Sequence, residues 1–238
     1  MARDIVLFLP GLLCDRAVWE PQIAALSARY DCLVADYGSA DSLVAMAHSA
    51  LGRTPARFSL VGHSMGGRVA LEIMRSVPER VARLALLDTG YQARLEGEAG
   101  EAECRKRYRL LELASSEGMR VMGRQWVQGM VHPDRLQDAG LIDPILAMIE
   151  RKTPQIFAAQ IRALLDRPSA EAVLRAIRCP TLVLCGRQDG WSPLSRHEQM
   201  RSLITGASLA VIEDSGHMVT LERPQQVAAQ LEGWLGHL

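Results

Sequence analysis

Gly62-His63-Ser64-Met65-Gly66-Gly67 is the stretch that decides the fold of this 238-residue chain. The apolar run Phe58–Val61 precedes it, and apolar residues at helical spacing follow it until Pro78 ends the pattern. A strand, a tight turn and a helix, with G-x-S-x-G at the turn, form the context of a nucleophile elbow. Glycines tolerate the crowded backbone on either side of Ser64, and the helix directs its positive end at the hydroxyl. The sequence therefore predicts a serine hydroxyl exposed at the end of a strand.

Composition and charge restrict the class of protein. Hydrophobic residues make up 48% of the chain, enough for a large core, and its length suits one α/β domain with an insertion. Lys+Arg and Asp+Glu both total 27, so the zero net charge argues against nucleic acid or a membrane surface as partner. The five cysteines include no C-x-x-C pair, which suits a reducing compartment. No apolar run is long enough to span a bilayer, and the first residues are more typical of a strand than of a signal peptide, so we expect a cytoplasmic location.

Short apolar runs alternate with helical patterns along most of the chain. Continuous apolar runs separated by helices predict a parallel sheet with right-handed crossovers. The predicted strands are Ile5–Leu9, Cys32–Ala35, Phe58–Val61, Ala82–Leu87, Thr181–Cys185 and Leu209–Ile212.

The alternation stops between Tyr91 and about Arg167. We therefore predict an α/β core made of residues 1–90 and 168–238, with residues 91–167 inserted as a helical cap over the carboxyl ends of the strands. A cap in that place shapes the substrate pocket and excludes water. The competing hypothesis is that these helices only add bulk to the fold. The helices expected there lie near Glu101–Glu117, Met119–Met130, Pro144–Lys152 and Gln155–Asp166.

A serine hydroxyl becomes a good nucleophile only when a base takes its proton, and the chain offers six histidines. His217 follows the last predicted strand. Loops after parallel strands open at the edge where the elbow opens, so His217 and Ser64 can meet. His63 adjoins the serine in the turn but is not expected to point at the same hydroxyl. The other histidines are expected mostly at the surface: His48, His132, His197 and His237.

The base needs a carboxylate that fixes its tautomer and stabilises the imidazolium. Asp189, after the fifth predicted strand, is the preferred acid, because it lies on the same sheet edge beside the last strand. Asp88, after the fourth strand, is the runner-up and would otherwise be a cap or a polar loop residue. Glu213 and Asp214 lie too close to His217 in the chain to serve.

An oxyanion at the reacting carbonyl needs hydrogen-bond donors. The backbone N–H of Met65, directly after the nucleophile, is one candidate. The loop Pro10-Gly11-Leu12-Leu13 after the first strand supplies the other, and the N–H of Leu12 is our candidate there.

Ser64, Asp189 and His217, in the chain order nucleophile, acid, base, resemble the catalytic triad of the α/β-hydrolases, and the resemblance covers nearly the whole chain. Gly-Arg-Gln-Asp-Gly-Trp-Ser-Pro and Ser-Gly-His-Met-Val-Thr-Leu-Glu-Arg-Pro are similar to the acid and histidine segments of that family. Small bacterial esterases, lactonases and carbon–carbon-bond hydrolases are the members that the chain resembles. A serine at the nucleophile position disfavours the dehalogenases and epoxide hydrolases, which use aspartate.

The resemblance implies the α/β-hydrolase fold, with about six parallel strands flanked by helices and a helical lid after the fourth. We expect the Cys32 strand at one edge and the Leu209 strand at the other. The chain differs from the common family pattern in two respects. Pro10-Gly11 replaces the usual His-Gly, and Met1 lies too near the first strand for the antiparallel strands that many relatives carry before it.

Together these residues predict a serine hydrolase that cleaves a small carboxylic ester through an acyl-enzyme, with a small-molecule substrate and without a metal or an organic cofactor. The same triad also suits a carbon–carbon-bond hydrolase, a lactonase or a lyase acting on a carboxylate-bearing substrate, which an arginine facing the pocket would favour. A hydrolase-like receptor without catalysis is a third hypothesis. The pattern indicates no oligomeric state.

Two groups of side chains bear on the substrate. The cations of the insertion, most of them expected on its wet face, are Arg94, Arg105, Lys106, Arg107, Arg109, Arg120 and Arg124. Met65 and Met218, which flank the triad, are candidates for an apolar pocket, whereas other bulky residues are more typical of core: Trp126, Trp191, Met122 and Met130.

Overall fold

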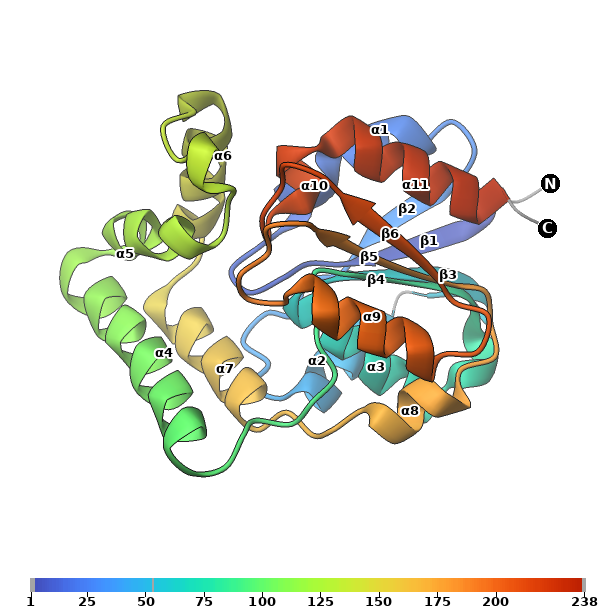
Figure 1. Ribbon diagram of the computed structural model, residues 1–238, viewed down its shortest axis with the longest axis horizontal. Coiled ribbons are helices and arrows are strands. Elements are labelled where there is room, and N and C mark those ends of the chain that lie inside the picture. Colours follow the sequence, from blue (N-terminus) through green and yellow to red (C-terminus); the bar gives the residue numbers. More distant parts are fainter. Residues whose placement is uncertain (1–2, 53, 237–238) are drawn as a thin grey trace.

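The computed structural model describes residues 3–52 and 54–236. Within these residues, six parallel strands form one sheet in the order β2-β1-β3-β4-β5-β6 (Figure 1). Their bounds are β1 Ile5–Leu9, β2 Asp31–Val34, β3 Phe58–His63, β4 Val81–Leu87, β5 Thr181–Gly186 and β6 Ser208–Ile212. The predicted parallel sheet and both predicted edge strands are confirmed.

Strand β3 lies inside the sheet, paired with β1 and β4, and all of its residues are buried. The two edge strands, β2 and β6, consist mostly of half-buried residues. The apolar runs of the inner strands follow from burial on both faces of a parallel sheet. The end of β3, where the elbow begins, is therefore held from both sides.

Helices cover both faces of the sheet (Figure 1). One face carries α1 (Glu20–Leu26), α10 (Val219–Glu222) and α11 (Pro224–Gly236). The other carries α2 (Leu43–Leu51), α3 (Met65–Ser76), α8 (Glu171–Ala176) and α9 (Leu194–Leu203). The helix predicted after the elbow is α3, and Pro78 follows its end.

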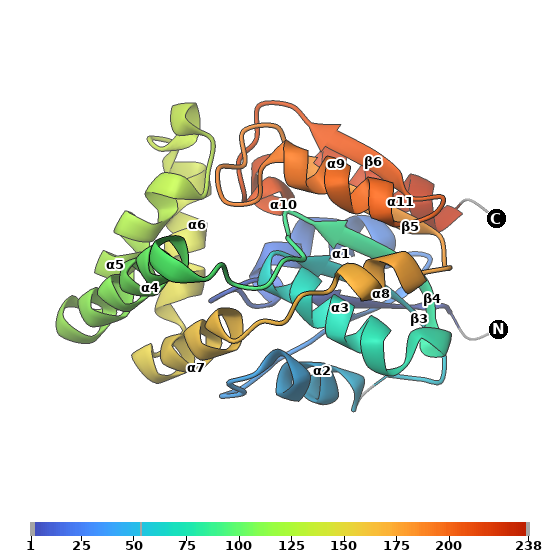
Figure 2. The same cartoon turned by 60° about the horizontal axis from the view of Figure 1, so that its bottom comes forward.

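Residues 91–167 hold the helices α4 to α7 and contain no strand. These helices lie beyond the carboxyl ends of the strands, on the side of the molecule away from both termini (Figures 1 and 2). Their bounds are α4 Gly97–Glu117, α5 Met119–Trp126, α6 Ala139–Glu150 and α7 Pro154–Leu165. The role of this segment as a lid stays a prediction.

Two helices of the insertion, α4 and α6, begin earlier than predicted. Helix α6 starts at Ala139 rather than Pro144, which lies inside it. The side chain of Asp138 accepts a hydrogen bond from the N–H of Leu141 and caps the first turn. The cap starts the helix before the proline, whose missing N–H removes only one bond of the helix.

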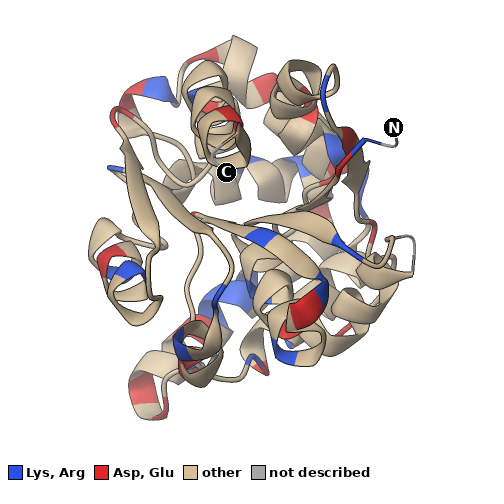
Figure 3. Ribbon diagram, turned by 90° about the vertical axis from the view of Figure 1, so that its right-hand side faces the viewer, with Lys and Arg blue, Asp and Glu red and all other residues tan. Residues whose placement is uncertain are grey.

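Charge is spread over the surface of the α/β core. Figure 3 shows basic and acidic residues interspersed over the side of the core that carries the chain termini. Within the described ranges, no helix is both long and apolar enough to span a bilayer. No group of three or more His, Cys, Asp or Glu side chains with the arrangement of a metal site occurs in the same ranges.

Candidate active site

The turn between β3 and α3 holds Ser64 in a strained conformation, with φ 55° and ψ −116°. Such a backbone costs about 1–3 kcal/mol and persists only where its surroundings enforce it. A Cβ on Gly62 would lie 2.5 Å from the carbonyl oxygen of Gly66, and one on Gly66 would overlap the carbonyl oxygen of Leu9. The N–H of Ser64 donates to the carbonyl of Leu87 at 2.9 Å, which ties the turn to β4. The sheet therefore fixes the place of the Ser64 hydroxyl.

The structure brings Ser64, His217 and Asp189 together in one chain of hydrogen bonds. The Ser64 hydroxyl donates to Nε2 of His217 at 2.7 Å, and Nδ1–H of His217 donates to Oδ2 of Asp189 at 2.8 Å. The other oxygen of Asp189 accepts the N–H groups of Trp191 and Ser192, both at 2.8 Å. His217 therefore presents an unprotonated nitrogen to the hydroxyl, in the tautomer that a general base requires.

The two candidate acids have different surroundings. The carboxyl of Asp88 accepts the N–H of Gly186 at 2.9 Å and that of Val219, at the start of α10, at 3.4 Å, and its Oδ2 lies 3.6 Å from Nε2 of His63. Burial and the negative charge of Asp189 raise the pKa of Asp88 well above its ordinary value. Burial would also raise the pKa of Asp189, but the charge and hydrogen bond of His217 outweigh it, so that pKa is lowered. Asp189 is thus the carboxylate that is ionised beside the histidine.

The loop that carries His217 is fastened by a buried carboxylate that the sequence analysis did not single out. Glu222 Oε1 accepts the N–H of Gly216 at 2.9 Å and of Met218 at 3.2 Å, and Oε2 accepts the N–H of His132 at 2.7 Å. A glutamate that reaches back to N–H groups ahead of a helix resembles half of a capping box. The position of Glu222, four residues after Met218, is the signal that could have revealed it.

Two further buried histidines support the site. His63 does not contact the Ser64 hydroxyl; its Nε2–H donates to the backbone carbonyl of His217 at 2.8 Å. His197 was expected at the surface and is fully buried, because it lies on the inner face of α9, where Nε2 accepts the N–H of Thr89 at 3.1 Å. Burial lowers the pKa of both rings, that of His197 to about 4, so both are neutral near pH 7.

The other two described histidines, His48 and His132, make no hydrogen bond to the serine hydroxyl. His48 is exposed, as expected, whereas His132 is half-buried. His237 lies outside the described residues.

The two proposed oxyanion donors flank the serine. Met65 is the first residue of α3, so its N–H has no partner within the helix. The loop after β1 passes beside the nucleophile, since a Cβ on Gly11 would lie 3.3 Å from Cβ of Ser64. Leu12 and Met65 both line the cavity that contains Ser64. These positions suit an oxyanion hole between the loop and the helix.

A cavity of about 420 Å³ opens over the Ser64 hydroxyl. Met65 lines it, but Met218 does not and is fully buried. The other bulky residues were expected in the core. The structure corrects this for those on α5, on the loop after α5 and on the loop after β5, because these segments meet at this cavity. Its apolar lining includes Trp126, Met130, Leu164 and Trp191, whereas Met122 is core.

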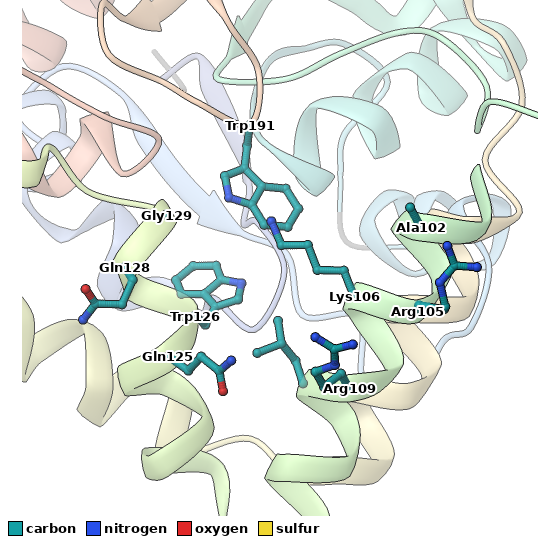
Figure 4. Close-up of a pocket in the computed structure, with 10 residues that line it drawn as sticks. Ala102, Arg105, Lys106, Arg109, Gln125, Trp126, Gln128, Gly129 and Trp191 are labelled. Carbon is teal, nitrogen blue, oxygen red and sulfur yellow. The ribbon is translucent and has the colours of Figure 1, made fainter. Parts of the chain in front are cut away.

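An outer cavity of about 600 Å³ adjoins the first and shares Trp126, Trp191 and Lys106 with it. Figure 4 shows Lys106 extending from α4 toward the ring of Trp191, and its Nζ lies 4.2 Å from the ring centroid. Such a distance fits a cation–π contact. Arg105 and Arg109 also line this outer cavity.

Comparison with known proteins gives concordant matches. A family model described as "Alpha/beta hydrolase family" matches residues 6–230. The pimeloyl-[acyl-carrier protein] methyl ester esterase of Nitrosomonas europaea is 26% identical, over 94% of this chain and 92% of that protein. The protein of the same name from Aromatoleum aromaticum is 27% identical, over 98% of both.

Solved structures show the same likeness. A thermophilic esterase from Thermogutta terrifontis, with malate bound, has a TM-score of 0.86 and 27% identity, over 98% of this chain and 90% of that chain. The enol-lactonase from Burkholderia xenovorans has a TM-score of 0.87 over 100% and 93% of the two chains, at 19% identity. The second match bears on the fold alone.

Proposed function

Because this chain belongs to the alpha/beta hydrolase family and is an ester-cleaving hydrolase, we propose that it cleaves a small carboxylic ester through an acyl-enzyme formed on Ser64. The observation that supports this most is the hydrogen-bond chain from the Ser64 hydroxyl through His217 to Asp189, at the floor of the 420 Å³ cavity. Nucleophile, base and orienting acid each have the partner that acyl transfer requires.

Acylation begins when Oγ of Ser64 attacks the ester carbonyl carbon and its proton passes to Nε2 of His217. Asp189 holds Nδ1–H and stabilises the imidazolium. The N–H groups of Leu12 and Met65 donate to the carbonyl oxygen as it gains negative charge, each worth about 3–4 kcal/mol in the transition state. The tetrahedral intermediate then breaks its bond to the alcohol oxygen, and the alcohol leaves with the proton from His217.

Deacylation repeats these steps with water. His217 takes a proton from a water molecule, whose oxygen attacks the acyl carbon, and the collapse of the second intermediate returns the proton to Ser64. The products are the alcohol and the carboxylic acid. Residues 91–167 act as the lid in this proposal, since Trp126, Met130 and Leu164 cover the nucleophile with apolar surface.

Relatives named as methyl ester esterases support a small alkyl ester as substrate. A second candidate, hydrolysis of a lactone or cleavage of a carbon–carbon bond in a carboxylate-bearing substrate, is favoured by the cations that line the cavity. These cations are Arg68, Lys106, Arg107, Arg167 and Arg196. The triad would provide the same nucleophile and base for either reaction.

The test is turnover of p-nitrophenyl esters from acetyl to octanoyl, with Ser64→Ala as the control. We expect turnover that disappears in the variant while its circular dichroism is unchanged, and the optimal chain length then measures the acyl pocket. An unchanged rate in the variant would refute the proposed nucleophile. Should the wild type leave these esters intact while Ser64 still reacts with a phosphonate probe, simple esters are wrong and lactones and acidic diketones are the next substrates. Tight ligand binding without any turnover would favour the receptor hypothesis.

A further inference from the structure

Guanidinium groups gather on one wall of the cavity that holds Ser64. They come from four separate elements: α3, α4, the segment after α7, and α9. The one glutamate that lines the same cavity is Glu103. The four side chains, called here the arginine cluster, are Arg68, Arg107, Arg167 and Arg196.

The single glutamate neutralises only part of this charge. Glu103 accepts hydrogen bonds from Arg107 at 2.8 Å and from Arg167 at 2.7 Å. Burial would raise the pKa of Glu103, but these two partners lower it to about 2, so the carboxylate is ionised at neutral pH. Asp88 also lines the cavity, but burial raises its pKa. The cluster therefore keeps a clear excess of positive charge.

Two members of the cluster have no acidic partner within the described residues. Arg68 donates to the backbone carbonyl of Gln92 at 2.8 Å, and Arg196 donates to that of Trp191 at 3.0 Å. Burial and the neighbouring cations lower the pKa of Arg68 to about 9. Each guanidinium carries five N–H donors, so most donors of these two side chains remain free for an anion.

A third member has an unused buried donor. Nε of Arg167 is buried and has no hydrogen-bond partner among the described residues. Buried polar atoms without a partner are rare, because each loses its hydrogen bonds to water without replacing them. Arg167 thus has an unused N–H donor in the part of the cavity lining where positive charge is in excess.

The backbone at Gly90 lies close to the side chains of Arg68 and Arg196, the two arginines without an acidic partner. Gly90 lines the cavity after β4, and a Cβ there would lie 2.9 Å from Cδ of Arg196 and 3.1 Å from Nη2 of Arg68. The two side chains therefore converge on the same glycine. Each guanidinium carries a planar fork of N–H donors, which can bind a carboxylate through two parallel hydrogen bonds.

We propose that the arginine cluster is a subsite for a free carboxylate on the substrate, so that the preferred substrates are half-esters of small dicarboxylic acids. This inference rests on the proposed function, because Ser64 attacks the ester group while the cluster holds the acid group. Ser64 caps the start of α3 and Arg68 follows in its first turn, and both line the same cavity of about 420 Å³. A cavity of that size limits the dicarboxylic acid to a short one.

The test compares charged and neutral methyl esters of the same shape by the acid that their hydrolysis releases, measured in a pH-stat. Monomethyl succinate, glutarate and adipate are paired with methyl 4-methylpentanoate, 5-methylhexanoate and 6-methylheptanoate, in which an isopropyl group replaces the carboxylate. We expect kcat/KM to be about 10- to 100-fold higher for the best half-ester than for its neutral partner, as one or two charge-assisted hydrogen bonds imply. Equal values within twofold for all three pairs would overturn the proposal.

Arginine variants test which side chains cause the preference for half-esters. Arg68→Met and Arg196→Met should each lower the ratio of half-ester to neutral-ester kcat/KM at least fivefold, and Arg68→Lys should give an intermediate ratio, because lysine keeps the charge and loses the fork. Arg124→Met, an exposed arginine of α5, is the matched control and should leave the ratio as in the wild type. A ratio that moves as much in the control as in the cluster variants would contradict the assignment.

A binding measurement distinguishes a failure of the carboxylate subsite from a failure of the proposed mechanism. Titration of Ser64→Ala with glutarate in a calorimeter should give binding that Arg68→Met weakens in the same background. If neither ester class is turned over in a Ser64-dependent way, the proposed function fails while this titration still tests the subsite. If neutral esters are turned over but glutarate does not bind and half-esters gain nothing, the subsite is wrong and the mechanism stands.

Discussion

Replacement of Glu222 by glutamine tests whether a buried carboxylate positions the base. Glu222 accepts three backbone N–H groups, two from the residues on either side of His217 and one from His132. Glutamine has nearly the same shape but only one acceptor oxygen. If that oxygen stays with Gly216 and Met218, the amide NH₂ meets the N–H of His132, and two donors face each other.

The expected loss can be worked out from these contacts. One charge-assisted hydrogen bond, worth about 1.5–3 kcal/mol, is removed, and the other two become neutral and roughly half as strong. Burial raises the pKa of Glu222 because the charged form is poorly solvated, and the neutral glutamine recovers part of that cost. The net loss should be about 2 kcal/mol, or a fall in Tm of about 4–8 °C for a chain of this size. Because the His217 ring is then no longer held in place, kcat/KM should fall about 10-fold or more.

The assay is ester turnover at a temperature well below both Tm values, together with thermal unfolding followed by circular dichroism. Glu213→Gln is the matched control, because Glu213 lies nearby on the surface, where it pairs with Arg187; neither Tm nor kcat/KM should change measurably. A fall in Tm with unchanged kcat/KM would mean that Glu222 supports the fold without positioning His217. No change in either quantity would refute the reasoning altogether.

Three further outcomes follow from the site. Asp189→Asn should lower kcat about 10³- to 10⁴-fold, whereas Asp88→Asn should retain most activity, and equal losses in the two variants would refute the choice of acid. Gly66→Ala should lower the free energy of unfolding in urea by about 3 kcal/mol or more, because its Cβ overlaps a carbonyl of β1, whereas Gly52→Ala, with ordinary contacts, should leave it unchanged or slightly raised. The carboxylate of Glu103, with a pKa lowered from 4.5 to about 2, should stabilise the fold above about pH 4.5 and lose that effect as the pH falls toward 2. The Tm difference between the wild type and Glu103→Gln should therefore be constant above pH 5 and shrink below pH 4.5, and a difference independent of pH would contradict the assignment.

The sheet and the meeting of Ser64 with His217 could be predicted from sequence because each depends on a short-range pattern. Apolar runs mark strands that are buried on both faces, and the elbow glycines follow from a turn that only a residue without Cβ can make. The loops after parallel strands share one edge, so the topology alone brings His217 and Asp189 toward the serine. What remained open was which acid serves, and the 2.8 Å hydrogen bond from His217 to Asp189 favours Asp189 over Asp88, whose carboxyl accepts backbone N–H groups instead.

Other features depend on contacts between residues far apart in the chain. His197 follows no apolar pattern that shows which side of α9 is buried, and its partner Thr89 lies 108 residues earlier in the chain. Trp126 and Trp191 are large apolar residues of a kind that suits either core or cavity, and their place is set by how α5 meets the loop after β5. Helical spacing shows which residues share a face but not what that face packs against. Met65 apart, the apolar lining of the cavity could therefore not be predicted from the sequence.

The arginines of the cavity show most clearly what could not be predicted from the sequence. The sequence analysis looked for substrate-binding arginines within the insertion, because a lid covers the pocket. Of the arginine cluster only Arg107 was among the cations singled out there, and Arg167 is the last residue of the insertion; Arg68 lies on α3, after the nucleophile, and Arg196 lies on α9. In the proposed function, the chemistry of the reaction is thus set by motifs in which the backbone dictates the residue. The proposed recognition of the substrate is distributed over side chains from both core and insertion, so a change of substrate would need alterations in several elements at once while the Ser64 turn stayed as it is.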